Sequence, residues 1–126
     1  MERNIKIDGR DVPFKATGGT VRLYRFKFGR DLLIDFTKMY NEVVEAQKAA
    51  NASEGEGVRS LSIDALTIFE NIAYIMAKQA DPDIPNDPDE WLDSFSMFSI
   101  YAVLPEIVEL WNISQLSTSE QKKKQV

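Results

Sequence analysis

One stretch near the N-terminus has the alternating pattern of β-strands, and long segments with helical periodicity follow it. Ile5 and Ile7 alternate with polar residues, and residues 12–16 are expected to return beside them after a turn at 8–11. A two-stranded hairpin is marginally stable alone in water, so it must pack on helices. The sequence therefore predicts an α+β fold, mainly α, with an N-terminal β-hairpin packed on about four to five helices.

The helical segments have apolar residues three and four positions apart. We expect helices over residues 21–28, 30–50 and 62–80, a short helix beginning near residue 87, and a last helix over 99–111. Pro105 is expected to kink the last helix or divide it in two, because proline lacks a backbone donor.

Several residues indicate where these helices begin and end. Thr20 and Ser62 are suited to N-cap positions, and Gly29 is typical of a helix end. Asp87 followed by Pro88 is the clearest start signal in the chain, because proline fits the first helical position and the aspartate accepts from free backbone donors.

The 30–50 segment predicts an amphipathic helix. Its expected buried face consists of Leu32, Leu33, Phe36, Met39, Tyr40, Val43 and Val44. Its expected solvent face consists of Asp35, Lys38, Asn41, Glu42 and Glu45. For the 62–80 helix the expected buried residues are Leu66, Phe69, Ile72, Ala73 and Met76.

A length of 126 residues fits one domain with its own core. We expect a single globular domain over residues 1–112, with a mobile polar loop at 51–60 and a disordered polar and basic tail at 113–126. No apolar run reaches the roughly 18 residues of a membrane span, and the N-terminus does not resemble a secretory signal.

The chain contains neither cysteine nor histidine. This removes thiolate nucleophiles, cysteine zinc sites and the commonest general base, so we expect no enzyme and no cofactor. The acidic run at 81–90 does not have EF-hand spacing, since Pro85 and Asn86 occupy its fifth and sixth positions, and helix capping explains it better than calcium binding. Gly18 and Gly19 lack the lysine of a phosphate-binding loop.

Charge is unevenly distributed along the chain. Residues 1–30 hold eight basic and three acidic residues, whereas residues 31–126 hold seven basic and 17 acidic residues. The net charge of −5 argues against general nucleic-acid binding. A basic front and an acidic remainder indicate contact with an acidic partner or with another copy of the chain; an uneven solvated surface is the alternative.

Candidate partner-binding residues fall into a basic group and an aromatic group. The basic group, interleaved with Tyr24, Phe26 and Phe28, is Arg22, Arg25, Lys27 and Arg30. It suits an acidic protein partner, with a solvated face or a nucleic-acid backbone as alternatives. The aromatic group is Trp91, Tyr101 and Trp111; we expect one tryptophan in the core and the other near a partner surface.

An ordered set of short segments resembles the tail assembly chaperones of long-tailed (siphovirus-type) bacteriophages and prophages of Gram-positive bacteria. The segments are PFKATGGT (13–20), RLYR (22–25), FGRDL (28–32), AKQADP (77–82), EWL (90–92), LPEI (104–107) and LW (110–111). The resemblance covers roughly residues 5–112, with a gap near 51–60, and it carries no catalytic or binding motif to transfer.

The resemblance implies a cytoplasmic protein of the infected or lysogenic bacterial host that is absent from the virion. Such a chaperone binds the tape-measure protein, keeps it soluble and helps tail-tube protein to polymerise, and self-association suits that task. The alternative is a DNA-binding or regulatory protein of a mobile genetic element, although no basic helix-turn-helix is found. A carboxylate–metal enzyme is a third, weaker alternative.

The same resemblance gives a hypothesis for Lys122, Lys123 and Lys124. Chaperones of this kind are often made in two lengths by a programmed frameshift near the end of the shorter frame. Three lysine codons in a row form an A-rich run on which a ribosome can slip. We therefore expect residues 1–126 to be the short product; a solubilising basic tail is the alternative.

Overall fold

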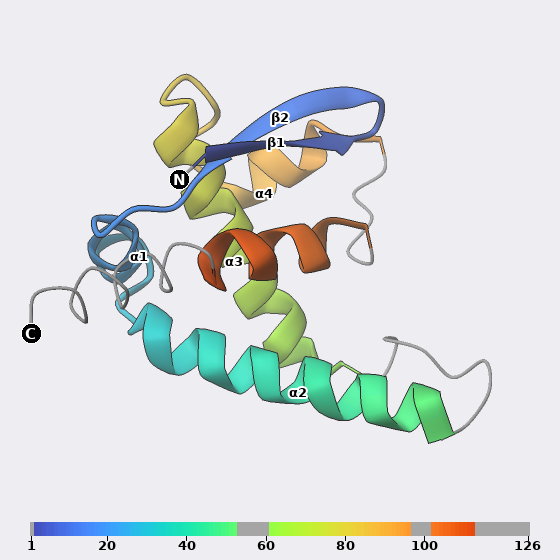
Figure 1. The fold of residues 1–126 in the computed structure, drawn as a ribbon. Helices are drawn as coiled ribbons and strands as arrows, with labels where there is room; N and C mark the ends of the chain where they lie inside the picture. The colour runs from blue at the N-terminus through green and yellow to red at the C-terminus, as the bar shows by residue number, and fades with distance from the viewer. Residues whose placement is uncertain (1, 53–60, 97–101, 113–126) are drawn as a thin grey trace, which may run out of the picture.

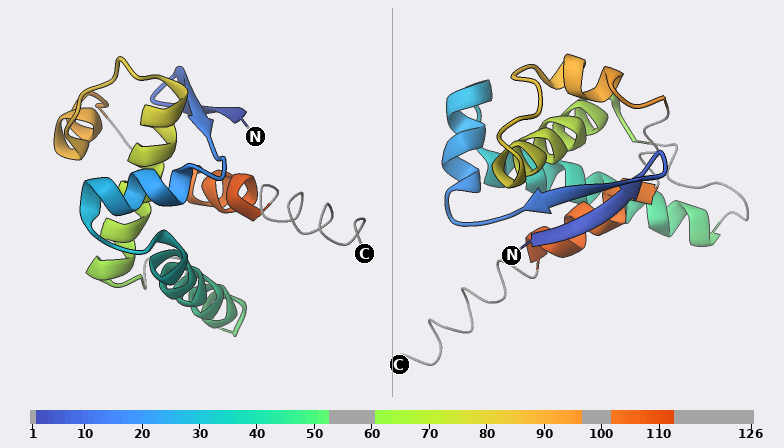
Figure 2. Two further views of the ribbon diagram at one scale, coloured as in Figure 1. Left: turned by 90° about the vertical axis from the view of Figure 1, so that its left-hand side faces the viewer. Right: turned by 90° about the horizontal axis from the view of Figure 1, so that it is seen from above.

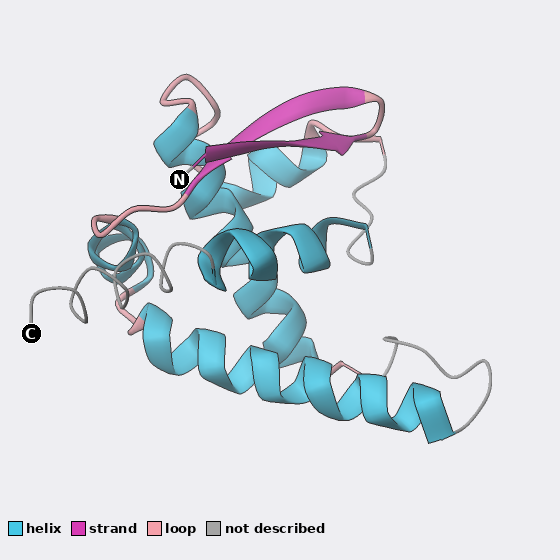
Figure 3. Cartoon of the chain, in the orientation of Figure 1, coloured by secondary structure: helices cyan, strands magenta, loops and turns pink. Residues whose placement is uncertain are grey.

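The computed structural model describes residues 2–52, 61–96 and 102–112. The expected loop at 53–60 and tail at 113–126 lie outside these residues, whereas Asn51 and Ala52 are helical. An N-terminal hairpin lies along one side of a set of helices (Figure 3), which confirms the α+β, mainly α class. None of the described helices is long and apolar enough to cross a membrane.

The hairpin consists of β1 (Glu2–Ile7) and β2 (Arg10–Lys15), which pair antiparallel with Ile7 opposite Arg10. Asp8 and Gly9 alone form the turn, both with positive φ (54° and 75°), which is the geometry of a two-residue type I′ turn. The turn is thus shorter than the four residues we expected, because the second strand begins directly after Gly9. Ile5 and Ile7 are buried, as their alternation predicted.

Among the residues that the structure describes, five helical segments follow the hairpin. They are α1 (Thr20–Phe28), α2 (Leu32–Ala52), α3 (Ile63–Ala80), α4 (Pro88–Asp93) and residues 102–112. The last segment is helical on both sides of Pro105, so the proline does not divide it into two helices.

The central element is α3, which contacts β2, α1, α2 and α4 (Figure 1). Four of its five expected core residues, Phe69, Ile72, Ala73 and Met76, are buried, whereas Leu66 is only partly buried. Burial extends beyond one face to Ala65, Ile68, Tyr74, Ile75 and Ala77, because neighbouring elements cover this helix on several sides.

Local capping interactions confirm three of the expected helix boundaries. The hydroxyl of Ser62 accepts from the backbone N–H of Ala65, and Asp87 accepts from Asp89 at the start of α4. Gly29 ends α1 with φ 67°, a left-handed conformation that glycine adopts without a Cβ penalty. The expectation for Thr20 is wrong: its buried hydroxyl donates to Gln79 at 2.6 Å and does not cap α1.

The orientation of α2 differs from the expected one. Leu32, Phe36, Met39 and Val43 are buried, but Leu33 is 48% exposed and Tyr40 is 37% exposed. Asp35, which we placed on the solvent face, is only 2% exposed. The helix is therefore rotated so that an acidic side chain enters the interior, and the partner of that side chain lies in the candidate site.

The last helix closes the remaining side of the core. Trp111 packs against Phe36 of α2, with ring centroids 5.8 Å apart. Arg3 of β1 pairs with Glu106 at 2.9 Å and with Glu109 at 3.3 Å. These contacts join the C-terminal helix to both the hairpin and α2.

Candidate partner-binding site

The two sides of α1 differ sharply in what they expose. Thr20 and Tyr24 are buried against the core, whereas Leu23 is 42% and Phe26 is 71% exposed. Leu23 and Phe26 are three residues apart, so they are neighbours on the helix surface. Adjacent large apolar side chains held in water are typical of a surface where another molecule binds.

A groove of about 390 Å³ adjoins these two side chains. It is lined from α1 by Leu23, Phe26 and Lys27, from α3 by Tyr74, Ile75 and Lys78, and from the following loop by Asn86. Figure 2 (left) shows α1 crossing in front of α3, and side chains of both helices line the groove. The groove thus has an apolar lining with cationic groups at its edges.

The two lysines of the groove are bound by backbone carbonyls of the loop after α3. Lys78 donates to the carbonyls of Pro82 (2.7 Å) and Ile84 (2.6 Å), and Lys27 donates to that of Asn86. Tyr74 fastens the same loop by donating to Pro85 at 2.7 Å. Backbone carbonyls are neutral acceptors, so these contacts orient the two ammonium groups without forming ion pairs.

Arg22 and Arg25 lie on the exposed surface of α1. The Arg22 guanidinium stands 5.2 Å from the centre of the Phe26 ring, which is a cation–π distance. Among the described residues, neither arginine forms an ion pair. Both side chains therefore lie in solvent on the outward side of α1.

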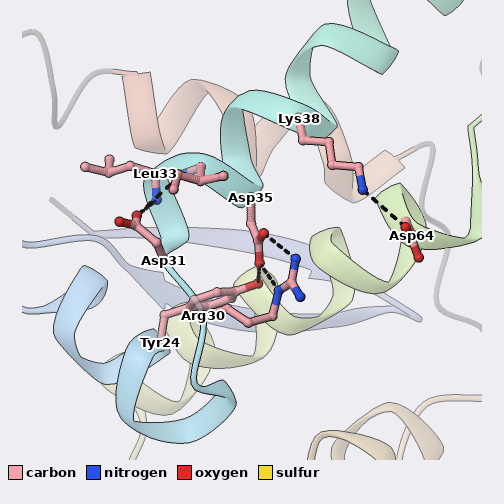
Figure 4. A network of polar contacts seen from close by, with 8 residues as sticks. Tyr24, Arg30, Asp31, Leu33, Asp35, Lys38 and Asp64 are labelled. Carbon is pink, nitrogen blue, oxygen red and sulfur yellow. Dashed lines mark hydrogen bonds and ion pairs between the residues drawn. The ribbon is translucent and has the colours of Figure 1, made fainter.

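Arg30 has a different role from the other three cations. Its Nε donates to Asp35 Oδ2 at 2.7 Å and its Nη2 to Oδ1 at 2.8 Å, in a bidentate pair (Figure 4). The Tyr24 hydroxyl donates to Oδ2 at 2.7 Å. This network joins the end of α1 to the first turn of α2, so Arg30 holds α1 in place against α2.

The network lowers the pKa of Asp35 and raises the pKa of Tyr24. The Arg30 hydrogen bonds, helped by that from Tyr24, hold the pKa of Asp35 below its usual range against the opposing effect of burial. Burial, with the Asp35 hydrogen bond and charge adding to it, raises the pKa of Tyr24. Asp35 is thus a carboxylate and Tyr24 a neutral donor at pH 7.

Neither tryptophan is available to a partner. Trp91 is 2% exposed and Trp111 is 3% exposed, so the expectation that one of them lies near a partner surface is wrong. Trp91 packs edge-on against Phe95 at 5.3 Å and Tyr74 at 5.9 Å. Trp91 also packs edge-on against Phe14 at 6.3 Å, so its indole fills the core between β2, α3 and α4. Tyr101 lies outside the described residues.

The acidic residues after α3 have structural roles of their own. Asp87 caps α4, and Asp81 accepts from the backbone N–H of Asp83 at 3.1 Å. In the described part of the chain, no group of acidic residues is placed to hold a metal ion.

Burial raises the pKa of Tyr74, and the nearby negative charges of Asp87 and Glu90 add to that effect. The loop that carries these acidic residues reaches the groove wall, because the carbonyl of Pro85 accepts from Tyr74 and Asn86 lines the groove.

Sequence reasoning found the cations of this surface but missed its apolar centre. Phe26 was named only among the aromatic residues interleaved with the basic group, and Leu23 was not singled out. A helical wheel of α1 contains the missing signal: with Tyr24 and Phe28 inward, Phe26 and Leu23 fall on the outward arc.

Comparisons with protein-family models, with curated proteins and with solved structures find no match for this chain.

Proposed function

We propose that this chain is a phage tail assembly chaperone that binds the tape-measure protein, keeps it soluble and aids polymerisation of the tail-tube protein, without entering the virion. In this proposal it acts in the cytoplasm of the infected or lysogenic host. The observation that carries it is the exposure of Phe26 and Leu23 on a helix that also presents Arg22 and Arg25.

The surface chemistry supports a helical, partly acidic client. A long helical protein waiting for its tube subunits exposes apolar side chains that must be kept from aggregating. Phe26 and the adjoining groove supply apolar contact, and arginines beside them supply bidentate contact to carboxylates. Helices recognised in grooves typically contribute apolar anchors at i, i+3, i+4 and i+7, and in this proposal the groove takes one such anchor of the client helix.

The first test is a pull-down after co-expression with the neighbouring open reading frames. The double variant Arg22→Glu with Arg25→Glu is expected to lose the tape-measure partner while its circular-dichroism spectrum stays unchanged. The matched control is Lys6→Glu with Lys48→Glu, which makes the same change in net charge at exposed residues outside α1. Equal recovery of the partner by both variants contradicts the proposal.

The proposal includes a longer product made by a frameshift at Lys122–Lys123–Lys124. The body of the short form and the extension of the long form would then be tethered to one client. Linked binding surfaces raise overall affinity through a high effective concentration.

A further inference from the structure

The turn of the hairpin is an Asp–Gly sequence that lies beside the segment after α4 (Figure 1). Asp8 and Gly9 both have positive φ, and both are exposed. Both carboxylate oxygens of Asp8 accept from Ser96. The Ser96 hydroxyl lies 2.8 Å from Oδ1 and 2.7 Å from Oδ2, and the Ser96 backbone N–H donates to Oδ2 at 3.0 Å. These contacts fasten the turn to a residue 88 positions further along the chain.

An aspartate followed by glycine is the dipeptide that most readily rearranges its own backbone. The glycine nitrogen, which no neighbouring side chain shields, attacks the aspartate side-chain carbon Cγ. The new N–Cγ bond closes a five-membered succinimide, and the carboxyl OH leaves as water with the amide proton. Water then adds to the former main-chain carbonyl of the aspartate and breaks its bond to nitrogen. In the product, isoaspartate, the main chain runs through Cγ and the old carbonyl is a free carboxylate.

The contacts with Ser96 oppose the first of these steps. A carboxylate whose two oxygens are hydrogen-bonded to Ser96 is not free to turn its carbon onto the Gly9 nitrogen. The hydrogen bonds from the Ser96 hydroxyl and N–H, helped by the charge of Arg10, hold the pKa of Asp8 below its usual range against the opposing effect of desolvation. Because a protonated carboxyl releases water far more readily than a carboxylate does, keeping Asp8 ionised at pH 7 slows ring closure further.

We propose that Asp8–Gly9 is a site of covalent self-modification by isoaspartate formation, and that Ser96 controls its rate. The reaction takes place in molecules whose hairpin tip has opened, because exposed turns open locally without global unfolding. The product has an additional main-chain atom between residues 8 and 9, and its carboxylate is attached directly to Cα. The two-residue turn then no longer closes with Ile7 opposite Arg10, and the shortened carboxylate no longer reaches Ser96.

Isomerisation therefore releases the tip of the hairpin from the segment after α4. Arg10 spans the same gap, since its Nη2 donates to the Ser94 carbonyl at 3.2 Å and its guanidinium lies 4.3 Å from the centre of the Phe95 ring. Both contacts depend on the place of Arg10 beside the turn, so they weaken together with the Asp8 contacts. None of these residues lines the groove beside α1, and the inference does not depend on the proposed function.

Prolonged incubation of the full chain at pH 7 tests the inference. IsoAspartate at residue 8 is measured by mass spectrometry of the tryptic peptide of residues 7–10, and by labelling with an isoaspartyl methyltransferase. Ser96→Ala removes the hydroxyl donor and should form isoaspartate roughly fivefold faster than the parent, as expected for the loss of a hydrogen bond that holds the tip closed. A free peptide of residues 3–12, which lacks the Ser96 contacts altogether, should react faster than either protein.

Matched variants separate the role of Ser96 from general loosening of the chain. Ser94→Ala removes a hydroxyl that donates to the Trp91 carbonyl and does not touch Asp8, so it should react at the parent rate. Ser96→Thr keeps both donors and should also keep the parent rate. Asp8→Glu cannot close a five-membered ring and should carry no isoaspartate at residue 8.

Equal rates in the parent and in Ser96→Ala overturn the role of Ser96. A free peptide that reacts no faster than the parent overturns protection by the fold, and this comparison needs no variant. Isomerised protein, separated from the unmodified chain, tests the structural consequence. Its amide hydrogen exchange over residues 5–12 should be faster than in the unmodified chain, and equal exchange contradicts release of the hairpin tip.

Discussion

Replacing Asp35 by asparagine removes a buried negative charge and leaves the size of the side chain unchanged. Asp35 is 2% exposed and accepts three hydrogen bonds, two from Arg30 and one from the fully buried Tyr24. The amide oxygen of an asparagine can still accept from Tyr24, but its NH₂ group cannot accept from a guanidinium. The substitution therefore breaks the bidentate pair and weakens the tyrosine contact.

The expected loss of unfolding free energy in Asp35→Asn follows from the surroundings of the two hydrogen-bond donors, Arg30 and Tyr24. The Arg30 side chain is 55% exposed, so water solvates it when the pair breaks, and losing that ion pair costs about 1 kcal/mol rather than the several kcal/mol of a fully buried pair. Changing the acceptor of a buried hydroxyl from charged to neutral costs about 1 kcal/mol more. We expect Asp35→Asn to lower the free energy of unfolding by about 2 kcal/mol at pH 7.

The effect should depend on pH in a defined direction. The pKa of Asp35 is lowered in the folded state, so the charged carboxylate contributes stability above the unfolded pKa of about 3.9 and loses it as the pH falls through the folded pKa. The stability difference between the parent and Asp35→Asn should therefore be full at pH 7, begin to shrink as the pH approaches the unfolded pKa of about 3.9, and be lost below the folded pKa.

Urea unfolding followed by tryptophan fluorescence measures this difference, because both tryptophans are buried. Glu45→Gln makes the same chemical change on α2 at a side chain that is 73% exposed, and it should alter stability by less than about 0.5 kcal/mol. If Asp35→Asn behaves like this control at pH 7, or if its effect is equal at pH 7 and at low pH, the buried network does not stabilise the fold as argued.

Three further outcomes can be measured separately. Gly29→Ala forces a Cβ into a backbone with φ 67° and should cost about 1 kcal/mol of unfolding free energy in urea, even though no atom lies within 4 Å of the added carbon. Trp91→Ala empties the space between Phe95 and Tyr74 and should cost about 3–5 kcal/mol, seen as a lower urea midpoint; Trp91→Phe should recover part of it. Recoding Lys122–Lys124 entirely to AAG leaves the peptide unchanged and should abolish any longer product on a blot against the N-terminal domain; persistence of that product refutes slippage at these codons.

Local interactions made much of this fold predictable from the sequence. The start of α4 at Asp87 and Pro88, the cap of α3 at Ser62 and the end of α1 at Gly29 each depend on groups within a few residues of one another. The alternation of Ile5 and Ile7 likewise specified a strand with one buried face. Such features are encoded in short stretches because backbone donors and acceptors at element ends are satisfied by near neighbours.

Tertiary packing decided what the local pattern left open. The first turn of α2 has apolar residues on several sides, since Leu32, Leu33 and Ile34 are consecutive, so periodicity alone did not choose which of them faces inward. The structure buries Leu32 and leaves Ile34 68% exposed, with the carboxylate of Asp35 drawn inward to Arg30 and Tyr24.

The candidate surface was decided in the same way. Four cations between residues 22 and 30 were visible in the sequence, but the separate role of Arg30 depends on Asp35 of the next helix. The exposure of Phe26 and the groove beside it depend on how α1 lies across α3 and on the loop carbonyls that hold Lys27 and Lys78. Residue order specifies which side chains a helix offers on each face, whereas only contacts between elements distant in sequence determine which face remains in water.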